Sequence, residues 1–185
     1  MWYNSLKSFL RGFEEGERES HMLVLGIDPG YAIIGYGLVD CRPGRFVPVE
    51  YGAVTTPAGM PFEQRLEQIF DGICSILSRR RPEAMAIEKL FFNTNTTTAI
   101  EVAEARGVIL LAAQKYKVPV YAYTPLQVKQ AVTGYGRAEK AQIIEMTRVL
   151  LHLDKAPKPD DTADALAIAI CHGQTAGSLL HRLGR

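Results

Sequence analysis

The chain has 185 residues, with 21 Lys and Arg against 20 Asp and Glu. This length suits one domain with a full hydrophobic core, and 47% hydrophobic residues is ordinary for a globular protein. The net charge of +1 excludes a whole-chain attraction to nucleic acid, so any such site must be a local patch. Three cysteines without CxxC spacing predict neither zinc nor a disulfide framework, and no 18-residue apolar run predicts a membrane span. A reducing compartment, the cytoplasm, is therefore expected.

Residues 1–21 differ from the rest of the chain. They carry apolar residues at helical spacing and then an acidic polar run, without the unbroken apolar core of a signal peptide. We expect either an N-terminal extension, with a possible docking role, or a cloning remnant that ends in "SHM". One domain is expected over residues 22–177, followed by a C-terminal tail over 178–185.

The first half of this domain predicts three strands and a helix. The strands are "LVLGIDPG" at 23–30, "YAIIGYGLVD" at 31–40 and "FVPVEYGAVTT" at 46–56, with a Pro-Gly turn at 43–44 between the last two. A helix is expected to open at Pro61, because apolar residues then recur every three to four positions until Arg79–Pro82.

The second half alternates strands and helices. Strands are predicted for "EAMAIEKLFF" at 83–92 and "VPVYAYTP" at 118–125, with a long helix over 93–116 between them. Helices are then expected over 125–133 and 139–153, and a last helix opens in "KPDDTADALAIAICH" after a linker at 154–159. This order predicts an α/β fold with a mixed five-stranded sheet flanked by helices.

Acidic residues interrupt the predicted core elements at three places. Asp28 ends the first strand, Glu88 lies in the fourth, and Asp160, Asp161 and Asp164 crowd the start of an otherwise apolar helix. A right-handed crossover can bring the first and fourth strands side by side, and the last helix must pack on the sheet. Converging carboxylates without a basic partner suit Mg²⁺, and two such ions can catalyse phosphodiester cleavage.

Each acid also has a simpler interpretation. Asp28 precedes Pro-Gly and can be a turn former, Glu88 can be an ion-pair partner, and an acid in a first helical turn is favoured by the helix dipole. Spacing alone does not choose between Asp160 and Asp161, because both share a helix face with Asp164.

Four segments together resemble the RuvC-type Holliday-junction resolvases: "GIDPG", "AIEKLFF", "QVKQAVTGYGRAEK" and "DDTADALAIAICH". The resemblance covers residues 22–175 and implies a ribonuclease H-like fold and Mg²⁺-dependent nicking of four-way DNA junctions by paired symmetric cuts, in recombination and repair. It implies two Mg²⁺ per active site, with Mn²⁺ as a substitute, held by the catalytic acids Asp28, Glu88, Asp161 and Asp164. Asp160 is then left as the helix cap. The N-terminal extension departs from the family pattern.

The same resemblance marks Lys129, Lys140 and Phe91 as DNA contacts, Phe91 by stacking on an unpaired base. The residues themselves show a local basic excess of Lys129, Arg137 and Lys140 against Glu139, although a solvated charged loop fits this pattern equally. Phe91 can be a core residue instead, and Phe92 can either pack or contact DNA.

The resemblance further implies a homodimer and a partnership with the RuvA–RuvB branch-migration complex. Small residues at Ala99, Ala103, Ala105, Gly107 and Ala112 indicate a helix surface that a partner could approach closely. Three alternatives remain at this point: another nuclease or transposase-like enzyme, an actin-like nucleotide-binding module, and a catalytically silent junction-binding protein. No Ser-His-Asp arrangement supports covalent catalysis.

Overall fold

A computed structural model describes residues 21–90 and 98–183 of the chain, and the side chains of this part up to residue 177. Five strands form one mixed sheet in the order β3-β2-β1-β4-β5. They are β1 (Met22–Asp28), β2 (Ile33–Arg42), β3 (Arg45–Thr55), β4 (Ala84–Glu88) and β5 (Val120–Tyr123). The predicted α/β class and mixed five-stranded sheet are confirmed.

The pairing of the strands explains how the chain order becomes this sheet. β1, β2 and β3 form an antiparallel meander, and Gly44 closes the predicted hairpin turn with a φ of +69°. β4 then pairs parallel with β1 and β5 parallel with β4, each reached through a helix. The register matches Ile27 with Ile87, so Asp28 and Glu88 end neighbouring parallel strands, as the crossover argument predicted.

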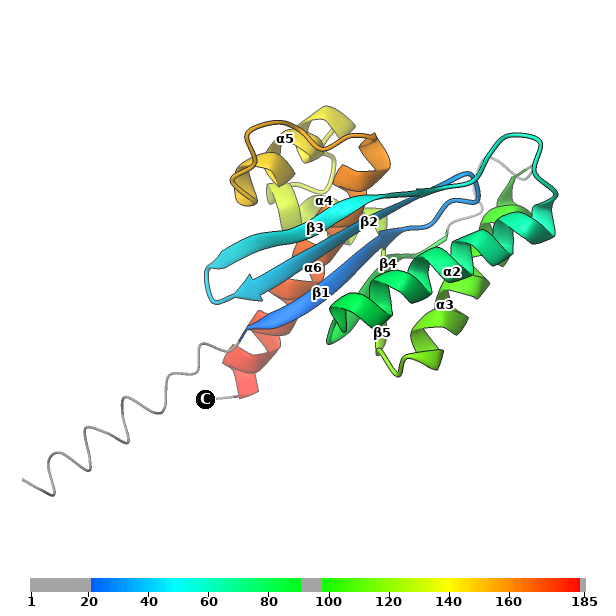
Figure 1. Ribbon diagram of the computed structural model, residues 1–185. Helices are drawn as coiled ribbons and strands as arrows, with labels where there is room; N and C mark the ends of the chain where they lie inside the picture. The colour runs from blue at the N-terminus through cyan, green and yellow to red at the C-terminus, as the bar shows by residue number, and fades with distance from the viewer. Residues whose placement is uncertain (1–20, 91–97, 184–185) are drawn as a thin grey trace, which may run out of the picture.

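Helices cover both faces of the sheet (Figure 1). One face carries α2 (Phe62–Arg80) and α3 (Ala99–Lys115), and the other carries α4 (Pro125–Thr133), α5 (Lys140–Leu150) and α6 (Asp160–Leu183). Successive side chains of a strand point to opposite faces of the sheet, so each face has its own hydrophobic core. Leu25 and Ile87 pack with α2 and α3, whereas Val24 and Ala86 pack with α6. α6 continues to Leu183, so helix extends into the segment expected to be a tail.

α6 lies unusually close to the sheet because glycines face it. Gly26 pairs with Gly37 across β1 and β2, and Gly35 pairs with Asp28. A methyl group on Gly26 would overlap the carbonyl oxygen of Ala165, and one on Gly35 would overlap that of Asp161. The backbone of α6 therefore rests directly on the backbone of the sheet, at the end where α6 begins.

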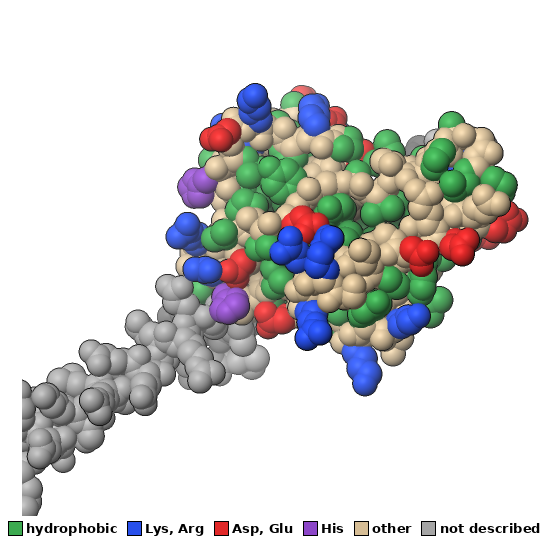
Figure 2. Space-filling view, viewed as in Figure 1, with side chains coloured by type: hydrophobic (Ala, Val, Ile, Leu, Met, Phe, Trp, Pro, Cys, Tyr) green, Lys and Arg blue, Asp and Glu red, His purple; other side chains and the backbone are tan. Residues whose placement is uncertain are grey.

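Surface charge is dispersed. Lys and Arg side chains are interspersed with Asp and Glu on the face that Figure 2 shows, in keeping with the small net charge. Within the described residues, no helix is long and apolar enough to cross a membrane.

Candidate active site

Three separate elements bring acidic side chains to one end of the sheet. Asp28 is the last residue of β1, Glu88 is the last of β4, and Asp161 and Asp164 lie in the first turns of α6. All four side chains are half-buried. The sheet register and the glycine contact at Gly35 hold these elements together, so the predicted convergence of strand ends and helix start is present.

The acids interact electrostatically across the site. Burial, followed by the charges of Glu88, Asp164 and Asp161, raises the pKa of Asp28 to about 7, while Lys140 opposes this rise. Burial likewise raises the pKa of Glu88, with Asp164 as the next cause. These raised pKa values mean that the clustered carboxylates repel one another when ionised. A bound cation would relieve this repulsion.

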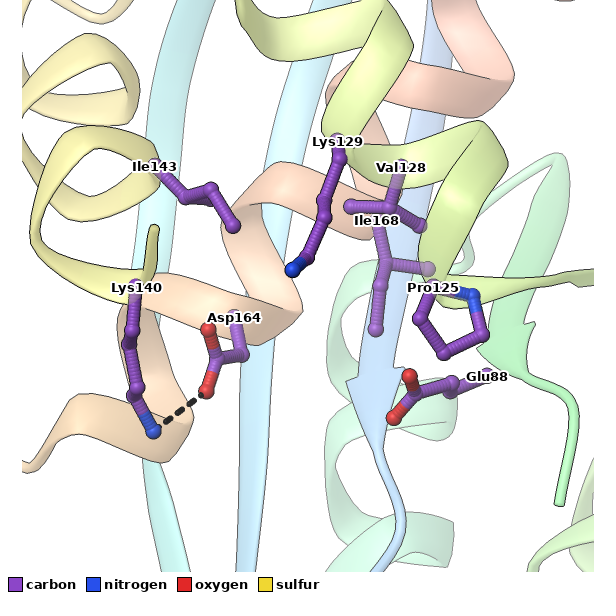
Figure 3. A pocket seen from close by; sticks show the side chains of 8 residues that line it. All are labelled: Glu88, Pro125, Val128, Lys129, Lys140, Ile143, Asp164 and Ile168. Carbon is purple, nitrogen blue, oxygen red and sulfur yellow. Dashed lines mark ion pairs between the residues drawn. The ribbon is translucent and has the colours of Figure 1, made fainter. Parts of the chain in front are cut away.

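One lysine supplies part of that charge. Lys140 Nζ lies 3.0 Å from Asp164 Oδ2, across the mouth of a pocket that Glu88 and Lys129 also line (Figure 3). Burial raises the pKa of Asp164, although the hydrogen bond from Lys140 lowers it; the pKa of the Lys140 ammonium is in turn raised by that hydrogen bond. The apolar side of the pocket is formed by Pro125, Val128, Ile143 and Ile168.

Capped helix starts fix the positions of the two lysines. α4 begins with a capping box in which Thr124 and Gln127 satisfy each other's backbone N–H groups, with Pro125 as its first residue. α5 begins with a second capping box between Glu139 and Gln142. The backbone N–H of Glu139 donates to Gln142 Oε1, and Glu139, the one acid of the basic stretch, is the N-cap residue of α5.

Asp160 lies at the edge of this cluster: its charge acts on Asp164 and Lys140 but is not among the causes that raise the pKa of Asp28. It is the first residue of α6, not the residue that precedes the helix, so the expectation that it forms the N-cap is not what the structure has. Its carboxylate accepts a hydrogen bond from Lys158 Nζ at 2.8 Å, and this contact lowers its pKa. With Asp160 paired to Lys158, Asp161 and Asp164 are the acids of α6 that act on Asp28 electrostatically, together with Glu88 of β4.

The donor set fits a hard divalent cation. The clustered acids offer only oxygen ligands, and Mg²⁺ is commonly held by one or two carboxylates and several waters. With the side chains as they stand, the described residues contain no group of three His, Cys, Asp or Glu that could hold one ion. This arrangement is compatible with a water-rich site and differs from a closed protein cage.

Of the residues predicted to contact DNA, three lie in the described part of the chain. Lys129 and Lys140 border the same pocket as Glu88 and Asp164, and Arg137 is exposed on the loop before α5. Phe91 and Phe92 lie outside the described residues. The pairing between Lys140 and Asp164 was not predicted from the sequence, because the two residues lie on different helices and no spacing rule connects them.

Comparison with known proteins identifies the family. The family model of crossover junction endodeoxyribonuclease RuvC matches residues 24–172. Crossover junction endodeoxyribonuclease RuvC of Brevibacillus brevis is 60% identical over 153 residues, which cover 83% of this chain and 92% of the relative. The same-named protein of Desulfitobacterium hafniense is 57% identical over 163 residues, covering 88% and 98%.

Solved structures agree with this assignment. Thermus thermophilus RuvC in complex with a Holliday junction substrate is similar with a TM-score of 0.81 and 41% identity, over 84% of this chain and 95% of that one. The yeast mitochondrial Holliday junction resolvase Ydc2 shares the fold, with a TM-score of 0.64 at 14% identity, over 95% of this chain and 87% of that one. The observed sheet and helices match the ribonuclease H-like fold that the resemblance implied. The chain belongs to the RuvC family of crossover junction endodeoxyribonucleases.

Proposed function

We propose that this protein is a Mg²⁺-dependent endonuclease that resolves four-way DNA junctions by paired symmetric nicks. The observation that carries the proposal is the meeting of Asp28, Glu88 and the start of α6 at one end of the sheet, beside a lysine-bordered pocket. Family membership supports it, since the relatives are crossover junction endodeoxyribonucleases and one was solved with a Holliday junction. The alternatives without nuclease activity leave the acid cluster unexplained.

The acids are assigned as metal ligands. Asp28, Glu88, Asp161 and Asp164 would hold two Mg²⁺ ions, with Mn²⁺ as a substitute. When bound, these ions supply an activated water and stabilise the leaving oxygen of a phosphodiester. Two of the acids end strands and two lie on a helix seated on glycines, so the protein itself contributes a rigid placement of ligands.

The lysines are assigned to the DNA. Lys129 and Lys140 stand on neighbouring helices at the mouth of the pocket, where their ammonium groups can donate to oxygens of the phosphate to be cut. Arg137, exposed on the adjoining loop, would contact a phosphate further along the strand. Phe91, three residues after Glu88, would stack on a base unpaired at the crossover, a contact worth roughly 1–3 kcal/mol.

A homodimer would present two such sites to the two-fold junction. The supporting surface is on α3, where Ile100 and Leu111 are 68% and 60% exposed and Gly107, also exposed, lies between them on the same helix face. The sequence prediction of this surface was wrong in two members: Ala105 and Ala112 are fully buried against their own domain. The proposed contact therefore consists of Ile100, Gly107 and Leu111 rather than an alanine stripe.

Two further assignments rest on the resemblance alone. We propose that the RuvA–RuvB branch-migration complex is a partner and that the protein acts in the cytoplasm, where such a nuclease would meet chromosomal DNA. Binding of the purified protein to a RuvA–RuvB–junction complex, measured against junction alone, tests the first assignment.

Cleavage of a synthetic four-way junction tests the proposed activity. With Mg²⁺, we expect symmetric nicks in two strands of like polarity, leaving ends that a ligase can seal, and little cleavage of a duplex or an RNA–DNA hybrid of the same sequence. Asp28→Asn supplies the inactive control and Asp160→Asn the active one. Equal cleavage of duplex and junction would indicate a different nuclease on the same fold, and no cleavage of any substrate by the wild type would contradict the proposal.

A further inference from the structure

Lys140, proposed above to contact a DNA phosphate, forms an ion pair with Asp164 in the structure. Lys140 Nζ lies 3.0 Å from Asp164 Oδ2, and the lysine side chain is 59% exposed whereas that of Asp164 is 28% exposed. The carboxylate is therefore fixed on α6, while the lysine reaches it with a long stem from the solvent side (Figure 3). Of these two side chains, the lysine is therefore the one that can move away.

A divalent cation at Asp164 would compete with this lysine. Mg²⁺ binds a carboxylate oxygen at about 2.1 Å, so the ion and the ammonium would share one carboxylate and repel each other. Free protein must thus give up the Lys140–Asp164 contact, in whole or in part, when a cation binds there. The ion pair lowers the affinity of the DNA-free protein for metal.

A DNA phosphate competes for the same lysine from the other side. Once Lys140 donates to a phosphate oxygen, its charge is partly neutralised and Asp164 is released to bind a cation. Each of the two ligands therefore removes the contact that opposes the other, and linkage requires the effect to be reciprocal.

We propose that Lys140 serves as an internal counter-ion of Asp164 that couples metal binding to junction binding. This inference rests on the proposed function and adds a regulatory role to it: the metal site is weak in the free enzyme and strengthens when DNA takes Lys140 away. Lys140 is a positioning residue in this scheme, since it acts on the metal through Asp164.

Lys129 offers a matched control for Lys140. It borders the same pocket and carries the same charge, but within the described part of the chain it forms no ion pair with an acid. A general loss of positive charge from the pocket would act through both lysines, whereas the proposed counter-ion effect belongs to Lys140. Lys140→Arg retains a charged partner for Asp164 and should preserve the effect.

Calorimetric titration of Mn²⁺ into DNA-free protein tests the first half of the coupling. We expect Lys140→Met to bind Mn²⁺ at least about fivefold more tightly than the wild type, the lower end of usual coupling, while Lys129→Met changes it less than about twofold and Lys140→Arg resembles the wild type. Unchanged affinity in Lys140→Met would overturn the inference, as would equal tightening in Lys129→Met. Melting curves confirm that each variant is folded.

Junction binding tests the second half. Fluorescence anisotropy with Ca²⁺ as the probe ion, compared with EDTA, should show a gain in junction affinity for the wild type that is at least about fivefold smaller in Lys140→Met. An equal gain in both proteins would overturn the coupling. Junction cleavage by the wild type is assayed in parallel: if it fails, the proposed function fails, while the DNA-free Mn²⁺ titration still decides the role of Lys140.

Discussion

Two helices on opposite faces of the sheet, α6 and α3, use their apolar residues in different ways. α6 is buried continuously from Ala165 to His172 and rests on glycines of β1 and β2. α3 buries only one face and leaves Ile100 and Leu111 exposed. The difference indicates that α6 is packed within its own domain and can place side chains rigidly, whereas α3 keeps an exposed apolar surface, the one proposed above for the dimer contact.

The largest expected effect concerns the acids at the start of α6 and the strand ends below it. Asp28→Asn, Glu88→Gln, Asp161→Asn and Asp164→Asn should each lower the rate of junction cleavage by at least roughly 10²-fold, because each removes a proposed metal ligand. Gel assays with labelled junctions measure this rate. Junction affinity in EDTA should stay the same or increase, since negative charge near the phosphates is lost.

Asp160→Asn is the control in the same turn of α6. Its carboxylate pairs with Lys158 and is not a proposed ligand, so cleavage should remain close to that of the wild type. An Asp160→Asn protein that no longer cleaves would show that the ligand assignment within the pair Asp160–Asp161 is wrong.

The second prediction concerns the open face of α3. Ile100→Glu and Leu111→Glu place charge in the proposed dimer contact and should convert the protein to monomers at micromolar concentration, with melting temperatures little changed. Analytical ultracentrifugation measures the oligomeric state. Val149→Lys, which alters an exposed apolar residue on α5, should leave it unchanged. A monomeric wild type, or dimers that survive both substitutions, would contradict this use of α3.

The third prediction tests the seat of α6. Gly35→Ala inserts a methyl group where the backbone of Asp161 lies, which should cost about 1–3 kcal/mol of unfolding free energy and shift Asp161 and Asp164 away from Asp28. Gly177 lies further along α6 with open space around it, so Gly177→Ala should raise the unfolding free energy by roughly 0.5–1 kcal/mol. Denaturant unfolding compares the two variants, and equal stabilities would show that the close approach of α6 is unnecessary.

Gly35→Ala should also weaken Mn²⁺ binding in the folded protein, which a purely destabilising substitution would not do. Calorimetry under conditions where the variant remains folded separates the two effects. Wild-type metal affinity in this variant would assign Gly35 to packing alone.

The smallest effect is expected from His172, further along α6. This ring is buried, contacts Tyr121 and forms a 2.7 Å hydrogen bond with the hydroxyl of Tyr123; burial lowers its pKa below 6.5. The unfolded chain therefore takes up a proton at a higher pH than the folded one, and the unfolding free energy falls as pH decreases below about 6.5. His172→Gln should lack this contribution. The unfolding free energy of both proteins is measured at pH 7.5 and 5.5. Comparing the two pH dependences isolates His172, because the other titrating groups are the same in both proteins.

The sequence predicted the order of the elements and the meeting of Asp28 with Glu88, because alternation, turn residues and crossover handedness act over short distances. It did not predict how closely α6 approaches the sheet, since this depends on Gly26 and Gly35 meeting a helix made much later in the chain. The pairing of Lys140 with Asp164 was missed for a similar reason: it depends on how α5 and α6 pack. The same local reasoning overestimated Ala105 and Ala112 as contact residues, because small size does not reveal which way a helix faces.

The origin of the acids from opposite ends of the domain has a consequence for synthesis of the protein. Asp28 lies in β1 and Asp164 in α6, so all five strands of the described sheet must be made before both acids are present. Contacts of such large sequence separation form late in folding. If the proposed ligand assignment holds, an unfinished chain that lacks α6 would have no complete ligand set, and DNA would meet an active nuclease only after the domain is whole.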